Sequence, residues 1–139
     1  DRLLGGQGDD IIFGGDNEVN IALDIEKLLI SKGVVNCRNL AGKTSVQELV
    51  SFISNLDVFV TGDSGPMHIA ASFGIPTVSL FGPTRDYETS QWLNSSNVIV
   101  KKNLDCQPCM KRSCPLNHHN CMKLIEASEV INAIESLKY

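Results

Sequence analysis

The sequence lacks the features that mark membrane, secreted and strongly charged proteins. It has no apolar run approaching the roughly 20 residues that cross a bilayer, and it does not open on a basic-then-apolar signal pattern. Its formal net charge of −4 excludes binding of bulk nucleic acid or anionic membrane through the whole surface. A length of 139 residues suffices for one domain with a hydrophobic core. We therefore expect a single soluble domain.

The sequence also lacks the signals of a disulfide framework. It contains five cysteines, an odd number, and four of them lie between Cys106 and Cys121. In a chain without a secretion signal this pattern indicates a reducing compartment rather than an oxidising one. We expect the protein to be cytoplasmic.

A calcium-binding repeat is matched once and does not recur. The segment GGQGDDIIF, residues 5–13, has glycine and aspartate at the positions of a calcium-binding nonapeptide. The next nine residues place Asn17 and Val19 where glycine and aspartate are needed. Such a solenoid needs about three turns for stability, so we favour a strand closed by Gly14 and Gly15. A helix with one apolar face follows, carrying Ile21, Ile25, Leu28 and Leu29.

Strand and helix signals then alternate along the chain. The segment SVQE, residues 45–48, is a capping box that opens a helix. Short apolar strands are predicted in GVVNCRNLAG, LDVFVTGD, TVSLFGP and NVIV, with Cys37 as a buried apolar residue of the first. This alternation predicts an α/β fold, a Rossmann-like parallel sheet with helices on both faces and right-handed crossovers.

Four polar or glycine-rich segments directly follow predicted strands. They are residues 14–18, 42–45, 61–68 and 81–84. In open α/β sheets ligands bind beyond the carboxyl ends of the strands. We expect the four segments to converge on one edge of the sheet.

The segment TGDSGPMH, residues 61–68, has the composition of an anion site. Small residues precede a helix whose first N–H groups and dipole favour a phosphate. Ser64 and His68 can donate hydrogen bonds, and Gly65 lets a ligand approach the backbone. Asp63 would repel a phosphate, so it suits sugar hydroxyls or a helix cap. Asp-Ser-Gly-Pro is equally a good cap and turn without any ligand, and both interpretations stay open.

Several longer motifs resemble one family. They are FGGDNE, LAGKTSVQELV, VTGDSGPMHIAASFGIPTVSLFGPT and the cysteine segment CQPCMKRSCPLNHHNCM. Together they resemble glycosyltransferase family 9, the heptosyltransferases of lipopolysaccharide core assembly, and the cysteine segment is similar to that of heptosyltransferase II relatives. The resemblance covers nearly the whole chain.

The resemblance implies a GT-B enzyme of two Rossmann-like domains, of which residues 1–139 look like the C-terminal, nucleotide-sugar-binding one. By matched position, Glu18 would bind the ribose hydroxyls and Thr44 would lie beside the base. Asp63 would bind sugar hydroxyls, while Ser64, Gly65 and His68 would hold the diphosphate.

The same resemblance implies a reaction and its partners. The donor would be ADP-heptose or a related nucleotide sugar, the acceptor would be the lipopolysaccharide core, and transfer would need no metal or other cofactor. The family's proposed general base, an aspartate of the N-terminal domain, has no position here, so we expect no catalytic residue in this domain and no activity from it alone. The enzyme would work in the cytoplasm, at the inner face of the cytoplasmic membrane.

The cysteine spacing supports a second hypothesis. Cys106, Cys109 and Cys114, followed by His119 or Cys121, approach a zinc-knuckle arrangement. Basic residues nearby make a zinc-stapled nucleic-acid or protein interaction module the alternative function. Against it, residues 105–122 lack the aromatic residues on which knuckles stack bases. The family resemblance instead implies an ordered excursion at 103–122, held by packing, a disulfide or a metal.

A final helix is expected at about residues 124–138, with Ser128 and Glu129 as its starting signals. Its apolar stripe contains Val130, Ile131, Ile134 and Leu137. If this helix crosses to the first domain, as in GT-B relatives, its stripe is partly exposed in the isolated domain. Self-association is then expected.

Overall fold

The computed structural model describes residues 9–137. The chain divides between Leu49 and Val50 into two compact units, inside helix α2 (Val46–Ile53). Each unit is described by itself. The glycines before residue 9 that match the calcium-binding repeat lie outside the described residues.

Unit 1 is a parallel strand pair joined by a helix. It contains β1 (Asp10–Ile12), a 3₁₀ turn η1 (Asp16–Glu18), α1 (Val19–Ser31) and β2 (Cys37–Asn39). The strands pair in parallel from Asp10 opposite Cys37 to Ile12 opposite Asn39. The predicted strand, glycine turn and helix are therefore confirmed in this unit. Cys37 is only half-buried, and burial raises the pKa of its thiol.

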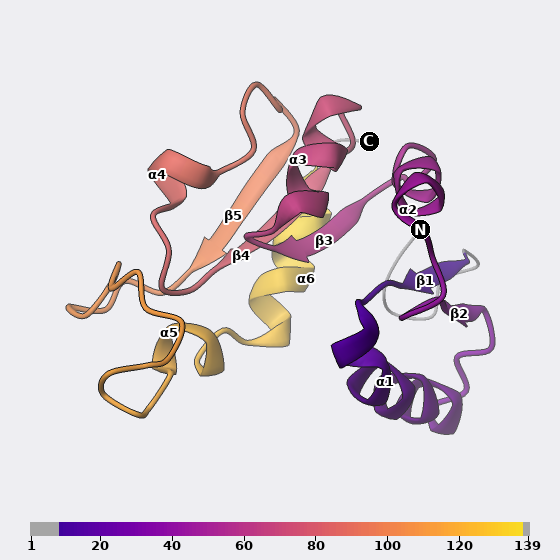
Figure 1. The fold of residues 1–139 in the computed structure, drawn as a ribbon, viewed down its shortest axis with the longest axis horizontal. Helices are drawn as coiled ribbons and strands as arrows, with labels where there is room; N and C mark the ends of the chain where they lie inside the picture. Colours follow the sequence, from indigo (N-terminus) through magenta and orange to yellow (C-terminus); the bar gives the residue numbers. More distant parts are fainter. Residues whose placement is uncertain (1–8, 138–139) are drawn as a thin grey trace. The chain divides into compact units, whose positions relative to one another are not determined.

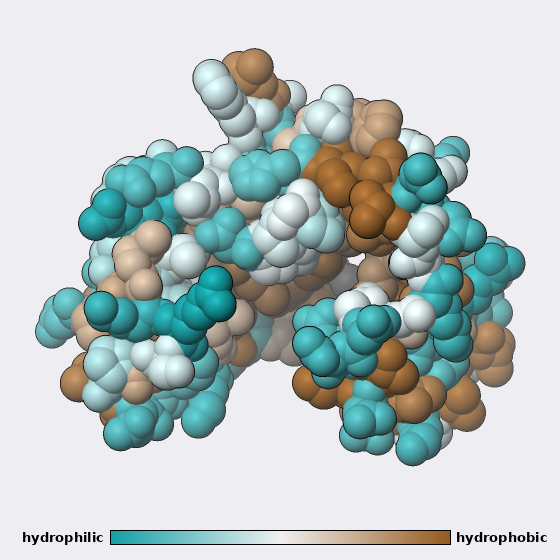
Figure 2. Space-filling view, in the orientation of Figure 1, coloured by the Kyte–Doolittle hydropathy of each residue, from teal (hydrophilic) through white to brown (hydrophobic). Residues whose placement is uncertain are grey.

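The buried face of α1 differs from the predicted one. Ile21 and Leu28 are 63% and 59% exposed, whereas Ala22 is buried. Figure 2 shows apolar side chains at the surface in the region of α1. Glu26 lies on the inner side, where its carboxylate accepts a hydrogen bond from Asn39 Nδ2 at 3.1 Å. The inner side of α1 therefore includes a polar contact, and several of its apolar residues are exposed.

Unit 2 contains a three-stranded parallel sheet with the order β3-β4-β5 (Figure 1). Its strands are β3 (Phe59–Gly62), β4 (Thr77–Phe81) and β5 (Asn97–Lys101). Its helices are α3 (Gly65–Ser72), α4 (Asp86–Thr89), α5 (Asn120–Lys123) and α6 (Ala127–Ser136).

Alternating residues of β4 face the two sides of this sheet. Val78 belongs to a buried cluster with Val100 of β5 and with Ala133 and Ile134 of α6. Thr77, Ser79 and Phe81 are fully buried on the other side, where α3 contacts β3 and β4. Helices therefore cover both faces, as predicted.

The strands form two sheets rather than one. Within residues 9–137, no ladder joins β1 or β2 to β3. The parallel α/β class is confirmed, but the single continuous sheet is not found. Sequence periodicity identifies strands, whereas their pairing depends on residues far apart in the chain.

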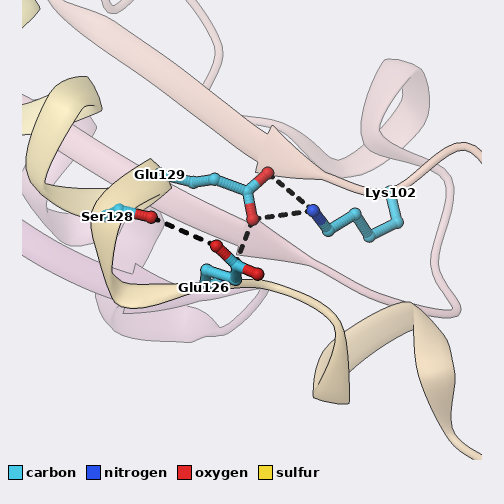
Figure 3. A network of polar contacts seen from close by, with 4 residues as sticks. All are labelled: Lys102, Glu126, Ser128 and Glu129. Carbon is cyan, nitrogen blue, oxygen red and sulfur yellow. Dashed lines mark hydrogen bonds and ion pairs between the residues drawn. The ribbon is translucent and has the colours of Figure 1, made fainter.

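The last helix, Ala127–Ser136, lies within its predicted bounds of about 124–138 and packs on the sheet of its own unit. Glu126 and Glu129 form a reciprocal capping box before Ala127, and Lys102 Nζ lies 2.7 Å from both Glu129 carboxylate oxygens (Figure 3). Ile134 and Leu137 are buried in the core of unit 2. Self-association was predicted from exposure of the apolar stripe of this helix, and these two residues of the stripe are not exposed. None of the helices in the described part of the chain is both long and apolar enough for a membrane span.

Because two glutamates cap helices, we expect the free energy of unfolding to decrease at acidic pH. The backbone N–H of Ser45 holds the pKa of Glu48 below its ordinary value, and that of Glu126 does the same for Glu129. A carboxyl with a lowered folded-state pKa stabilises the fold above its unfolded pKa, and the contribution is lost as pH falls through the folded pKa. Urea unfolding should therefore show stability decreasing as pH drops below about 4.3.

The matched variants are Glu48→Gln and Glu129→Gln, because glutamine can still close a capping box. Each variant should make the free energy of unfolding less dependent on pH at acidic pH. Glu135→Gln, at the other end of α6, should leave this pH dependence unchanged. Parallel profiles for the wild type and the two capping variants would contradict this account.

Candidate functional site

The start of α3 has the backbone geometry expected of an anion site. Ser64 is extended at the N-cap and Pro66 lies in the first turn. The Ser64 hydroxyl bonds the carbonyl of Gly62 at 3.3 Å and lies 3.2 Å from Thr61 Oγ1. No side-chain hydrogen bond caps the helix. The positive end of the helix dipole is therefore open to a ligand.

The residues predicted to hold a phosphate are accessible. Ser64, Gly65 and His68 are all exposed. A methyl group added at Gly65 would meet nothing within 4 Å. There is thus open space over the first turn of α3, and the three residues lie within a single helical turn of the N-cap.

Asp63 is held by a residue that the sequence did not indicate. Thr89 Oγ1, in α4, lies 3.0 Å from both Asp63 Oδ2 and the Arg85 carbonyl oxygen, and its hydroxyl can donate to either acceptor. Lys101 anchors the start of α4 to β5 through Asp86, at 2.7 Å. Of the two predicted roles for Asp63, the helix cap is not found. The contact also joins the segment after β3 to the helix after β4.

A buried hydroxyl lies at the end of the segment that follows β4. Thr84 Oγ1 and Gln91 Nε2 are buried without a hydrogen-bond partner in the described structure, while Gln91 Oε1 accepts a hydrogen bond from Ser79 at 2.9 Å. Buried polar groups are stabilised by a partner, which includes a water or a ligand. Thr84 belongs to the predicted segment 81–84.

Unit 1 brings its two predicted segments together. The Gly42 N–H donates to the Gly14 carbonyl at 2.9 Å, so residues 14–18 meet residues 42–45 where β1 and β2 end. Glu18 Oε2 accepts the Gly15 N–H at 2.8 Å, which is a turn-closing role. Thr44 is half-buried and precedes the confirmed Ser45 capping box. Two of the four segments therefore meet in unit 1, and the convergence of all four on one sheet edge stays a prediction.

The four clustered cysteines share one pocket. All four are free thiols, and only Cys121 is buried. The pocket is lined by Pro83, Cys106, Gln107, Cys109, Lys111, Cys114, Pro115, Leu116, His118, His119 and Cys121. Among residues 9–137, no three His, Cys, Asp or Glu side chains are placed so that they could hold a metal ion. The geometry therefore gives the predicted zinc site no support, and zinc binding stays a prediction.

Two of these thiols have opposite environments. The Cys114 sulfur lies 3.4 Å from the His119 N–H, which donates to it, and this contact and neighbouring amides lower the pKa of Cys114. Burial raises the pKa of Cys121, followed by the negative charge of Cys109, Cys114 and Cys106. The His119 backbone is left-handed, which shapes the turn around Cys114.

The cysteine segment is attached to the end of β4. Gln107 Nε2 donates to the Gly82 carbonyl at 2.7 Å, and the Met110 N–H donates to the Pro83 carbonyl at 2.9 Å. The predicted excursion at 103–122 is thus held partly by hydrogen bonds to the loop that leads to Thr84.

Close packing at Gly82 yields a stability prediction. A Cβ at this position would lie 2.5 Å from Met122 Sδ and 2.9 Å from its Cγ. Gly82→Ala should destabilise the chain by about 1 kcal/mol, the low end for overpacking, because Met122 is flexible. Urea denaturation of Gly82→Ala, Met122→Ala and the double variant measures the coupling. The cost of Gly82→Ala should disappear in the Met122→Ala background, and an unchanged cost there would contradict the assigned clash.

The architecture of the two units defines a class of protein. Parallel strands followed by glycine-rich turns and an uncapped helix start are typical of α/β proteins that bind nucleotides and phosphates. The chain belongs to glycosyltransferase family 9 (heptosyltransferase), whose family model matches residues 3–120.

Its relatives include lipooligosaccharide heptosyltransferase 2 of Campylobacter jejuni serotype O:6, which is 41% identical over 128 residues, or 91% of this chain and 40% of the relative. Lipopolysaccharide heptosyltransferase 2 of Salmonella typhimurium is 35% identical over 89 residues, or 64% of this chain and 26% of the relative. The chain thus spans about 40% of the length of the Campylobacter relative.

A solved structure supports the fold. The structure of E. coli ADP-heptose LPS heptosyltransferase II matches with a TM-score of 0.74 at 24% identity, over 92% of this chain and 35% of that one.

Proposed function

We propose that this chain is the donor-binding part of a heptosyltransferase that transfers heptose from ADP-heptose, or a related nucleotide sugar, to the lipopolysaccharide core. The observation that carries the proposal is the uncapped start of α3, with Ser64, Gly65 and His68 exposed around it. Family membership and the names of the relatives support the choice of heptose and of a lipopolysaccharide acceptor.

The diphosphate is assigned to the first turn of α3. Pro66 has no N–H and the Met67 N–H already donates to the Ser64 carbonyl at 3.1 Å, so the Gly65 N–H and the helix dipole favour its negative charge. The Ser64 hydroxyl and the His68 imidazole can donate to its oxygens. Negative charge grows on the nucleoside diphosphate as the glycosidic bond to the donor breaks. Fixed donors at this position therefore stabilise the leaving group in the transition state.

The sugar and the nucleoside are assigned to carboxylates. Asp63, fixed by Thr89, accepts hydrogen bonds from heptose hydroxyls. In unit 1, Glu18 accepts them from the ribose, and Thr44 lies beside the base. One Glu18 oxygen already accepts the Gly15 N–H, which fixes the orientation of the carboxylate for this role.

The chain is proposed to bind the donor but not to complete transfer alone. The acceptor hydroxyl must lose a proton as it attacks the anomeric carbon, and none of the residues assigned above is placed as that base. The whole enzyme is proposed to act in the cytoplasm at the inner membrane face, without a metal for transfer.

Calorimetric titration with ADP, UDP and GDP tests the diphosphate site. We expect one of the three to bind selectively. His68→Ala should weaken it roughly tenfold, as loss of a hydrogen bond to a charged group does. Gly65→Ala should keep its melting temperature, because the added methyl meets no protein atom, yet should also weaken binding.

Ser72→Ala is the matched control, since Ser72 lies at the opposite end of α3 and bonds the Ile69 carbonyl. The proposal is wrong if the folded chain binds none of the diphosphates, or if the Gly65 and His68 variants bind as tightly as Ser72→Ala.

Comparison of ADP with ADP-heptose tests the sugar assignment. Thr89→Val removes the hydroxyl that holds Asp63 and should reduce affinity for ADP-heptose while leaving that for ADP unchanged. Thr89→Ser keeps the hydroxyl and should behave as the wild type. Equal losses for the two ligands would place Thr89 outside sugar recognition.

A further inference from the structure

Positive charge is concentrated in the cysteine segment and the lysine that follows it, residues 106–123. This stretch contains Lys111, Arg112 and Lys123 but no aspartate or glutamate, although the whole chain has a net charge of −4. All three cations are exposed, and none of them belongs to an ion pair among the described residues. Lys102, which precedes the stretch, is by contrast paired with a carboxylate of α6. Residues 106–123 therefore present unneutralised positive charge on an acidic protein.

Exposed apolar side chains lie in and beside the same stretch. Met110 is 47% exposed, Leu116 is 57% exposed, and Leu124, just after the stretch, is 47% exposed. Lys111 and Leu116 line the same pocket, so a cation and an aliphatic side chain share one surface. The stretch thus combines two features that water-facing loops usually keep apart.

The backbone gives this part of the chain a defined shape. Met110, Asn117 and His119 have φ angles of 55°, 57° and 58°, a left-handed conformation that residues other than glycine adopt rarely. Such conformations persist where the surrounding structure fixes them. The Met110 N–H donates to the Pro83 carbonyl at 2.9 Å, and the Asn117 N–H donates to the Cys114 carbonyl at 3.1 Å. Figure 1 shows these residues in the long loop between β5 and α5 of unit 2.

This combination of side chains favours a lipid surface over a nucleic acid. Lysine and arginine are attracted to an anionic leaflet, and exposed aliphatic side chains gain free energy when they enter the boundary between headgroups and acyl chains. Residues 105–122 contain no Phe, Tyr or Trp on which bases could stack. An anionic bilayer complements both the charge and the apolar side chains.

A second exposed apolar patch in unit 2 lacks this charge. Tyr87, Trp92 and Leu93 are 73%, 83% and 91% exposed. The two acidic residues of α4 are paired with Arg85 and Lys101, so the charges around this patch neutralise one another. An anionic membrane would attract it less strongly, and it serves as the comparison surface in the test below.

We propose that residues 106–123 form a membrane-docking surface whose partner is an anionic phospholipid bilayer. Lys111, Arg112 and Lys123 contact lipid phosphates, while Met110 and Leu116 insert at the level of the headgroups. Because the chain as a whole is negative, the contact is confined to this surface. The surface adds to the proposed location at the membrane without resting on the donor site, and its test contains no nucleotide.

Vesicle sedimentation with the 139-residue chain, kept reduced, tests the docking surface. Vesicles of phosphatidylcholine alone are compared with vesicles of equal parts phosphatidylcholine and phosphatidylglycerol. We expect binding to the anionic vesicles, weakened as salt screens the attraction. Lys111→Gln should weaken this binding about fivefold, the effect of one cation near an anionic leaflet. Leu116→Gln should weaken it at low and high salt alike, because its contribution is apolar.

Lys32→Gln is the matched control. Lys32 is an exposed cation at the end of α1 in unit 1, so this variant changes the net charge by the same amount as Lys111→Gln. It should leave vesicle binding unchanged. All three substituted side chains are exposed, and thermal melting of each variant should match the wild type.

Tryptophan fluorescence identifies the surface that meets the lipid. Trp92 is the only tryptophan of the chain, so Trp92→Phe provides a background without an indole. Leu116→Trp in that background should shift its emission to the blue when anionic vesicles are added, because the indole enters a less polar environment. The emission of Trp92 in the wild type should stay where it is.

Four results would overturn the proposal. The first is that the folded chain binds neither kind of vesicle, and the second is equal binding to both kinds. The third is an equal loss for Lys32→Gln and Lys111→Gln, which would indicate an effect of net charge rather than a defined surface. The fourth is a blue shift at Trp92 without one at position 116, which would move the contact to the patch beside α4.

Discussion

Unit 2 depends on the pairing of β4 with both of its neighbours. Thr77, Val78, Ser79 and Phe81 are buried, and β4 pairs in parallel with β3 on one side and β5 on the other. Its buried hydroxyls bond within the unit, Thr77 to the Ile75 carbonyl and Ser79 to Gln91. Parallel pairing brings the carboxyl ends of the strands to one edge, so the segments with polar chemistry emerge side by side.

The proposed donor-binding segments and the cysteine segment both lie at this edge of the sheet. The chain leaving β3 forms the uncapped start of α3, and the chain leaving β4 leads through Gly82 and Thr84 to the helix that holds Asp63. The cysteine segment bonds the same loop at Gly82 and Pro83. The proposed donor site and the cysteine pocket therefore share one short loop as a structural support.

Features with local causes could be predicted from the sequence, and features with distant causes could not. The Ser45 capping box and the start of α3 depend on residues within one helical turn, and both are confirmed. The contact between Thr89 and Asp63 and the two separate sheets depend on residues far apart. In α1, apolar spacing did not predict the inner face, where Ala22 is buried and Glu26 contacts Asn39. The cysteine spacing indicated that the four cysteines lie together, but it did not reveal that no three potential metal ligands among the described residues are placed to share an ion.

The most direct test of the account is to record backbone amide resonances during titration with the nucleoside diphosphate. We predict saturable shifts at Ser64, Gly65 and Met67, where α3 begins, together with smaller shifts around Asp63 and Thr89. Residues at the far end of α3, such as Ser72, should not move. Saturable shifts that leave the start of α3 unchanged, or that appear only in the cysteine segment, would contradict the claim that this helix start holds the diphosphate.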